Sequence, residues 1–255
     1  MDKQGFAWWA FEEGETQGEA LLELAWDSGM RGVDFLPADL WPAARAVGFE
    51  LLAIDGHPSV DEGLNDSSNA STMIDYMSRA IADASEGGAH FIAVASGRAD
   101  GRSDGEGIRS CISALSAVAD DAKAAGVEII LEPLNTRYDH KDQQCDTVEW
   151  ARAVIDGLGH PSVRLLFDIY HVQLTQGDII NRLRESSDIL GHVHTAGVPG
   201  RSNLGVGQEL NYAAIAGSLR DQGYAGWVVH EFTPTGDVGR ALREAKELFD
   251  APEHS

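Results

Sequence analysis

Eight short apolar segments recur along the chain and alternate with stretches of helical character. They are rich in Val, Ile, Leu and Phe and show little alternation of polar and apolar residues, which is typical of parallel strands buried on both faces. The segments are residues 5–9, 32–36, 50–55, 91–96, 127–132, 163–168, 189–194 and 227–231. Eight such repeats predict an α/β protein that forms a single (β/α)8 TIM barrel.

The segments between these strands carry helix signals. Residues 16–29 and 70–88 place apolar side chains at helical spacing, and residues 108–125 and 211–223 end at or next to a glycine. A doubly wound open sheet is the alternative fold. That fold usually has a glycine-rich phosphate loop after its first strand. Residues 8–15, with the sequence WWAFEEGE, show no such loop.

Length and charge narrow the classes of function. The chain has 255 residues, close to the roughly 250 of a TIM barrel, and no low-complexity linker divides it, so we expect one domain over residues 1–255. The net charge of −22 disfavours nucleic acid and anionic membranes as partners. We see no signal peptide and no long uncharged apolar stretch, and only two cysteines, so we expect a cytoplasmic protein without a membrane span.

Four chemically distinctive residues stand where apolar strand segments end: Glu132, Asp168, His194 and Glu231. The gaps between them are 36, 26 and 37 residues, close to the roughly 30 residues of one strand-and-helix repeat. In a closed barrel the carboxyl ends of the strands meet at one mouth. Three carboxylates gathered there would repel one another unless a cation held them. The pattern predicts a divalent-metal site, although Asp168 alone could equally be a helix cap.

This set of oxygen and nitrogen donors suits Mn²⁺ or Mg²⁺, with Co²⁺ or Zn²⁺ as alternatives. A small substrate with adjacent carbonyl and hydroxyl groups could bind at the open positions of such an ion. Removal of the proton between those groups gives an enediolate. Glu132 and Glu231 come from strands on different sides of the mouth, so we expect them to take and return the proton. The predicted reaction is isomerisation or epimerisation.

Several motifs resemble the hydroxypyruvate isomerase family, which belongs to the xylose-isomerase-like barrels together with the ketose 3-epimerases. They are GHVHTAGVPGR (191–201), GVGQELNY (205–212), FDIYHVQ (167–173), LEPLN (131–135) and HEF (230–232). The resemblance implies a metal bound by the four residues above, with Glu132 and Glu231 as the acid/base pair. It also implies substrate contacts from His171 and Arg201, and it matches Glu209 to a glutamate of the family's GxGE segment.

The chain departs from the classical bacterial hydroxypyruvate isomerases at one metal position. They carry Gln where this chain has His194, whereas the epimerases carry His. We therefore expect either a hydroxypyruvate-type ketoacid or a ketose as substrate. A carboxylate-bearing substrate would need a cation, and Arg201 is the best candidate. His57, after the third strand, is a further candidate contact, and Lys141 is a weaker one.

Other residues and functions stay open at this level. His192 is expected to be a packed interior histidine, and either Trp8 or Trp9 could line the site. A lyase, such as a keto-inositol dehydratase or a C-glycoside-cleaving subunit, would begin with the same proton abstraction. A non-catalytic sugar-binding barrel is a further alternative. A DNA-repair endonuclease conflicts with the charge of −22. The expected partner is a small molecule, and a homo-oligomer is open.

Overall fold

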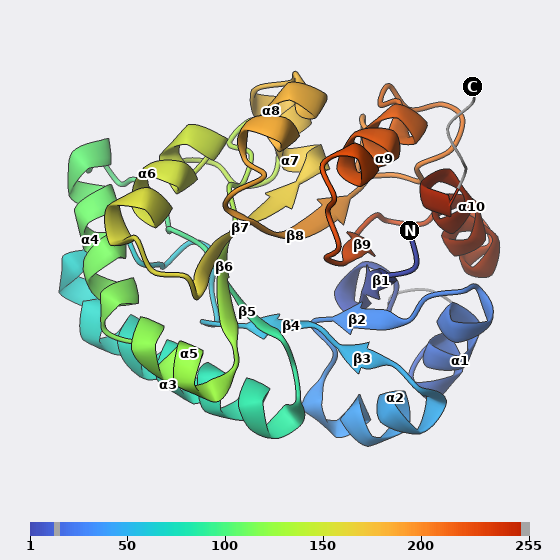
Figure 1. Cartoon of the computed structure of the whole chain (residues 1–255), viewed down its shortest axis with the longest axis horizontal. Coiled ribbons are helices and arrows are strands. Elements are labelled where there is room, and N and C mark those ends of the chain that lie inside the picture. The colour runs from blue at the N-terminus through green and yellow to red at the C-terminus, as the bar shows by residue number, and fades with distance from the viewer. Residues whose placement is uncertain (13–15, 251–255) are drawn as a thin grey trace. The chain divides into compact units, whose positions relative to one another are not determined.

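The computed structural model of the chain describes residues 1–12 and 16–250 (Figure 1). Glu13 and His254, both expected at the surface, lie outside these ranges. The contacts group the chain into two compact units interleaved along the sequence. Unit 1 comprises residues 1–52, 178–187 and those from 193 onward, and unit 2 comprises residues 53–177 and 188–192. The expected single domain over residues 1–255 stays a prediction, and each unit is described by itself.

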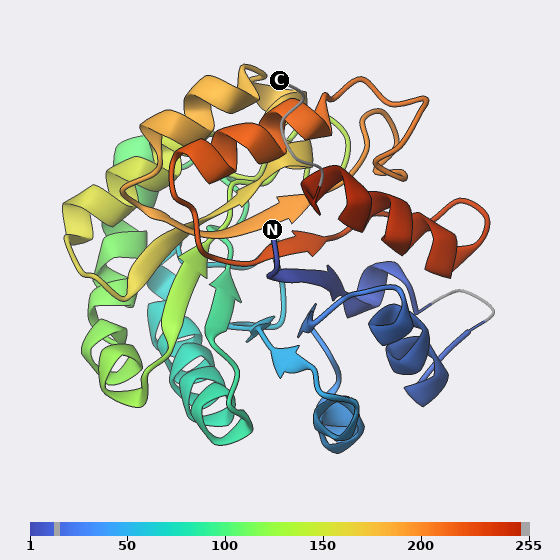
Figure 2. The same cartoon turned by 45° about the vertical axis from the view of Figure 1, so that its right-hand side comes forward.

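Unit 1 is a parallel sheet with helices, and it joins segments far apart in the sequence. Its hydrogen-bonded strands run in the order β3-β2-β1-β9-β8. Figure 2 shows β1 and β9 side by side, and Phe6 is paired with His230. The strands are β1 (Gln4–Ala7), β2 (Gly32–Asp34), β3 (Glu50–Leu51), β9 (Val228–His230) and the end of β8 (Leu190–Thr195); the helices are η1 (Trp8–Ala10), α1 (Glu19–Asp27), η2 (Ala38–Leu40), α2 (Trp41–Val47), α8 (Ile179–Glu185), α9 (Tyr212–Asp221) and α10 (Val238–Asp250).

Unit 2 repeats the same architecture, with strands β4, β5, β6 and β7 paired in that order and the first residues of β8. Its helices lie along the outside of these strands (Figure 1). The strands are β4 (Ala53–Asp55), β5 (Phe91–Val94), β6 (Glu128–Leu131) and β7 (Val163–Asp168); the helices are η3 (Ser67–Asn69), α3 (Ala70–Gly87), α4 (Asp104–Ser116), α5 (Ala119–Ala125), α6 (Val148–Leu158) and α7 (Ile169–Thr175).

The third expected strand, residues 50–55, is two strands in the structure. β3 pairs with β2, and β4 pairs with β5. Leu52 separates them, and its amide donates to the carbonyl oxygen of Val33 at 2.9 Å. The described residues therefore contain nine strands instead of the eight predicted. A periodicity argument cannot find this break, because residues 51–54 form one uninterrupted apolar run and the change of pairing partner depends on the tertiary structure.

Several further expected elements differ in extent: β2 ends at Asp34 and β5 at Val94, each two residues before the predicted end. The first strand ends at Ala7 because Trp8 begins a 3-10 turn, which the amide of Phe11 closes by donating to the Trp8 carbonyl oxygen at 3.0 Å. Strand alternation therefore does not apply to Trp8 and Trp9: Trp8 is buried, whereas Trp9 is 41% exposed. The expected helix over residues 108–125 is likewise divided into α4 and α5.

The core of each unit follows from the apolar faces of its helices. α3 buries the predicted stripe residues Met73, Met77 and Ile81 and ends at Gly88, whose φ of 66° is the left-handed conformation that glycine tolerates. Cys111 of α4 is a free, buried thiol. None of the described helices is long and apolar enough to cross a membrane.

We expect the close approach of β1 and β2 to require glycine. A Cβ at Gly5 would lie 2.6 Å from the carbonyl oxygen of Gly32, a backbone atom that cannot move aside. Gly5→Ala should therefore lower the free energy of unfolding by about 1–3 kcal/mol, as overpacking does. A urea titration with an unchanged slope would measure this loss.

Gly105→Ala in α4 is the matched control. A Cβ there meets only the end of the flexible Arg109 side chain, at 3.3 Å. Replacing a helical glycine with alanine should leave stability unchanged or raise it by about 0.5–1 kcal/mol. A Gly5→Ala protein that unfolds at the wild-type urea concentration would contradict the steric argument.

Candidate metal and substrate site

The predicted ligands His194 and Glu231 lie together in unit 1. His194 is the last residue but one of β8, and Glu231 directly follows β9, the strand that pairs with β8. The Nδ1 atom of His194 is 3.1 Å from Oε2 of Glu231. Its Nε2 atom is 2.8 Å from Oδ2 of Asp34, the last residue of β2. The imidazole is fully buried between two carboxylates.

This arrangement decides the charge of His194. Burial alone would lower its pKa, but the carboxylates of Glu231 and Asp34 outweigh burial and hold the pKa of His194 well above its ordinary value. Each carboxylate in turn contacts one nitrogen of the imidazole. A cation bound to His194 and Glu231 would take the place of the Nδ1 proton, since a metal ligand must be deprotonated.

Glu231 is held by hydrogen-bond donors. The indole Nε1 of Trp9 donates to Oε1 at 2.8 Å, and Nη2 of Arg201 donates to Oε2 at 2.6 Å. The Arg201 guanidinium also lies over the Trp9 ring, 4.9 Å from its centre. Donors of this kind stabilise the ionised carboxylate. Glu231 is 4% exposed, so its oxygens have defined positions, and the structure brings Trp9, Arg201 and Glu231 into one cluster.

The other two predicted ligands, Glu132 and Asp168, lie together in unit 2. Glu132 directly follows β6, Asp168 ends β7, and one oxygen of each lies within 4.8 Å of the other. Oδ1 of Asp168 caps α7 by accepting from the amide of Tyr170 at 2.7 Å, while Oδ2 lies 3.6 Å from Nε2 of His171. Asp168 is therefore the helix cap that the sequence allowed, and its second oxygen can still bind a cation.

His171 is oriented by residues that the sequence analysis did not identify. Its Nδ1 accepts from the backbone amide of Asn135 at 3.1 Å, so in the neutral ring the proton is on Nε2, the atom that faces Asp168. The side-chain amide of Asn135 lies 2.7 Å from the same Nδ1 and donates to Asp139 at 2.6 Å. The Tyr170 hydroxyl donates to that Asp139 oxygen as well, at 2.8 Å.

The remaining predicted substrate contacts are His57, Glu209 and Lys141. His57 is buried, its Nε2 accepts from the amide of Ala95 at 3.0 Å, and burial lowers its pKa. Glu209 and Lys141 are exposed. The substrate roles of these three residues stay predictions. His192 is fully buried against the ring of Phe91, 5.0 Å between centres, which confirms the expected interior histidine.

Asp34 is a further carboxylate of the candidate site that the sequence analysis did not single out. It lies in the middle of the expected strand over residues 32–36, but in the structure it is the last residue of β2, so it stands at a strand end as Glu132 and Asp168 do. Asn135 is the last residue of the LEPLN motif (131–135), but its contact with His171 could not be read from that motif, because the contact depends on where the loop after β6 passes His171. A local pattern does not encode that approach.

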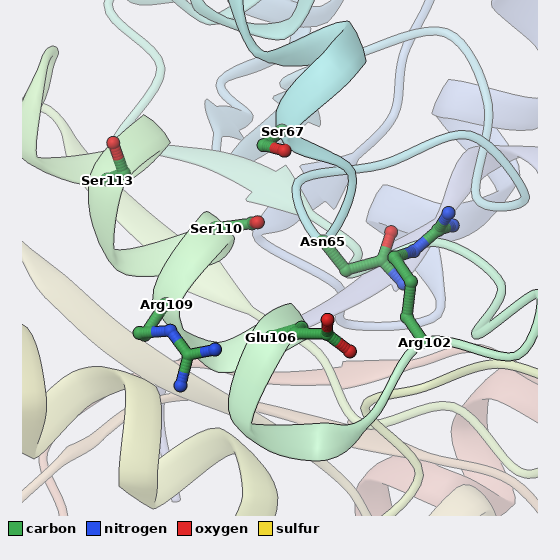
Figure 3. A pocket seen from close by; sticks show the side chains of 7 residues that line it. All are labelled: Asn65, Ser67, Arg102, Glu106, Arg109, Ser110 and Ser113. Carbon is green, nitrogen blue, oxygen red and sulfur yellow. The ribbon is translucent and has the colours of Figure 1, made fainter.

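Unit 2 also has a surface cavity of about 510 Å³ between η3 and α4 (Figure 3). Ser110 and Ser113 project toward it from α4, and Ser67 from η3. Its arginine Arg102 is paired with Asp66 at 3.3 Å. The lining residues are Asn65, Ser67, Arg102, Glu106, Arg109, Ser110 and Ser113, and none of them is a predicted site residue.

Comparison with known proteins identifies similar chains. A family model described as "Xylose isomerase-like TIM barrel" matches residues 15–251. A human protein provisionally named hydroxypyruvate isomerase is 36% identical over 125 residues, which are 49% of this chain and 45% of that protein. The 2-oxo-tetronate isomerase of Cupriavidus necator is 33% identical over 128 residues, 50% of this chain and 48% of that protein. The matches therefore span about half the length of these curated relatives.

A solved structure gives the fold independently. The crystal structure of an AP endonuclease, family 2, from Brucella melitensis superposes with a TM-score of 0.87 at 22% identity, covering 96% of this chain and 98% of that one. Identity at that level is evidence of fold alone. Together with the family model, it confirms the predicted TIM-barrel fold.

We expect the side-chain amide of Asn135 to stabilise the folded protein as a hydrogen-bond donor. Asn135→Asp keeps the shape but places a carboxylate where an N–H now donates to Asp139 at 2.6 Å. The loss of a buried donor should lower the free energy of unfolding by about 1–3 kcal/mol. Urea unfolding at neutral pH would measure it.

Asn181→Asp provides the same chemical change at an exposed pair, where the Asn181 amide donates to Asp178 at 2.9 Å. Its effect should stay within about 0.5 kcal/mol. Equal effects of the two substitutions would show that the Asn135 network contributes nothing beyond a surface contact.

Proposed function

This chain belongs to the xylose isomerase-like TIM barrel family, and on that premise we propose that it is a metal-dependent isomerase or epimerase of small hydroxy-carbonyl compounds. The observation that carries the proposal is the buried pairing of His194 with Glu231, whose carboxylate is also bound by Arg201. This cluster contains two proposed metal ligands, His194 and Glu231. Glu231 is also the proposed base, and Arg201 is the cationic group that could bind the substrate.

We propose Glu132, Asp168, His194 and Glu231 as the ligands of one divalent ion. The half-buried Glu132 and the buried Asp168 hold oxygens within 4.8 Å of each other in unit 2, where two ionised carboxylates repel unless a cation balances them. Three carboxylates and one imidazole suit Mn²⁺ or Mg²⁺. When bound, such an ion would polarise the oxygens of a substrate carbonyl and hydroxyl pair.

Glu132 and Glu231 are proposed to move the proton. Isomerisation and epimerisation both remove a proton next to a carbonyl group and return one, to a neighbouring carbon or to the other face of the same carbon. The N–H donors of Trp9 and Arg201 orient the Glu231 carboxylate, as a positioned base requires. His171, with its proton on Nε2, can donate to a substrate oxygen.

A 2-oxo acid is the substrate class that we favour over a neutral ketose. Arg201 supplies the guanidinium that a carboxylate binds best. The two relatives described above carry names of isomerases acting on hydroxypyruvate and on a 2-oxo-tetronate, both of them 2-oxo acids. Their names support this choice by similarity over half a chain.

A screen of 2-oxo acids and ketoses in deuterated water with Mg²⁺ tests the proposal by NMR. We expect product formation with deuterium entering the carbon next to the carbonyl group. Glu132→Gln and Glu231→Gln should each lower the rate by about 10²–10⁴-fold, because each removes one proton-transfer group. Glu128→Gln, at the start of β6, is the control and should keep wild-type activity. Full activity in either active-site variant would refute the acid/base pair.

Metal binding should be measurable without any substrate. Mn²⁺ at 100 times its dissociation constant should stabilise the folded protein by about 2.7 kcal/mol. We expect a higher melting temperature with Mn²⁺ than after chelation, and Asp168→Asn should abolish most of the difference. Glu128→Gln should retain it. A wild-type protein whose melting temperature is the same with Mn²⁺ and with chelator would count against the metal site.

A further inference from the structure

The two nitrogens of His194 contact different carboxylates, and they do so on opposite sides of the ring. Nδ1 faces Glu231 at 3.1 Å, whereas Nε2 faces Asp34 at 2.8 Å. Resting on the proposed function above, we propose that Asp34 is a positioning residue: it accepts the Nε2 proton of His194 and thereby makes Nδ1 the metal-ligating atom. Nothing in the four-ligand pattern of the sequence includes Asp34.

The backbone directly after Asp34 has an unusual conformation. Phe35 has a φ of 56°, in the left-handed region that a bulky side chain rarely adopts. In a regular strand, consecutive side chains point to opposite faces. Here both contact the same imidazole: Asp34 binds Nε2, and the ring of Phe35 meets the ring of His194 edge-on at 6.1 Å and 88°.

Unusual backbone conformations of this kind persist where the surroundings hold them, and they concentrate at functional sites. At this position the conformation turns two successive residues toward one histidine. Asp34 fixes the proton on one nitrogen, and Phe35 limits rotation of the ring. Asp34, Phe35 and His194 all belong to unit 1, so the arrangement depends on that unit alone.

The chemistry of the contact explains what Asp34 contributes. A neutral imidazole can carry its proton on either nitrogen, and only the other nitrogen has a lone pair for a metal. A buried carboxylate at Nε2 selects the tautomer with the lone pair on Nδ1, and it makes that lone pair more basic. Asp34 and His194 are both completely buried, so water cannot substitute for the carboxylate.

Substitution of Asp34 tests the inference through metal affinity, a readout that needs no substrate. Asp34→Asn keeps the shape and an acceptor oxygen but removes the charge, and Asp34→Ala removes both. Titration calorimetry with Mn²⁺ should show affinity in the order wild type, Asn, Ala, with a loss of about 10–100-fold. Wild-type affinity in the Asp34→Ala protein would overturn the inference, because alanine cannot accept the Nε2 proton.

Thr195→Val is the matched control, because Thr195 directly follows His194 in β8. Its buried hydroxyl lies 2.9 Å from Nδ1 of His230, so the change removes a hydrogen bond beside the site without touching His194. We expect a lower melting temperature but unchanged Mn²⁺ affinity. If Thr195→Val weakens Mn²⁺ binding as much as Asp34→Asn does, the loss of Mn²⁺ affinity reflects a general loss of stability, and the inference is wrong.

A measurement on the wild-type protein decides the matter even if the Asp34 variants fail to fold. With ¹⁵N-labelled histidine, addition of Zn²⁺ should shift the Nδ1 resonance of His194 while Nε2 keeps its proton. A metal-induced shift of Nε2 with the proton on Nδ1 would overturn the inference and leave the proposed function intact. A wild-type protein that binds neither Mn²⁺ nor Zn²⁺ would instead refute the proposed metal site itself.

Discussion

The buried imidazole of His194, placed between the carboxylates of Asp34 and Glu231, is the constraint on which the rest of the candidate site depends. Charged groups in an apolar interior are tolerated only when they are paired and hydrogen-bonded. Asp34 ends β2, and Glu231 directly follows β9. Both carboxylates can contact the imidazole of His194 in β8 only if these three strands of unit 1 end at the same level of the sheet. Parallel pairing of neighbouring strands provides that match, as in the pairing of Thr195 with His230.

In unit 2, Asp168 and His171 are likewise held in place by polar contacts. Asp168 uses one oxygen as a helix cap and turns the other toward His171, and Asn135 fixes which nitrogen of His171 carries the proton. In unit 2, then, a neutral His171 is held in one tautomer by a group on its far side, and we propose that Asp34 does the same for a metal-bound His194 in unit 1. Such groups act through the histidine, so a pattern of metal ligands and substrate contacts does not identify them: Asp34 lies outside the quoted motifs, and Asn135 lies in LEPLN without a role of its own.

Much of the fold was accessible from the sequence because eight apolar segments recur along the chain and alternate with stretches of helical character. The exceptions are instructive. In the segment over residues 50–55, residues 51–54 form one uninterrupted apolar run, so nothing there indicates that Leu52 separates a strand paired with β2 from a strand paired with β5. Trp8 and Trp9 look like the end of a strand, but a 3-10 turn places the Trp9 indole on Glu231.

By itself, the sequence determined the α/β class, the order of the strands and helices, and four ligand candidates, since each of these is a local pattern of apolar runs and the residues that end them. The tertiary structure decided which atoms meet: Asp34 at Nε2 of His194, Arg201 and Trp9 at Glu231, and Asn135 at His171. These contacts join residues up to 222 positions apart, as with Trp9 and Glu231. Their existence depends on backbone paths, such as the left-handed turn at Phe35, that come from packing and not from local propensity.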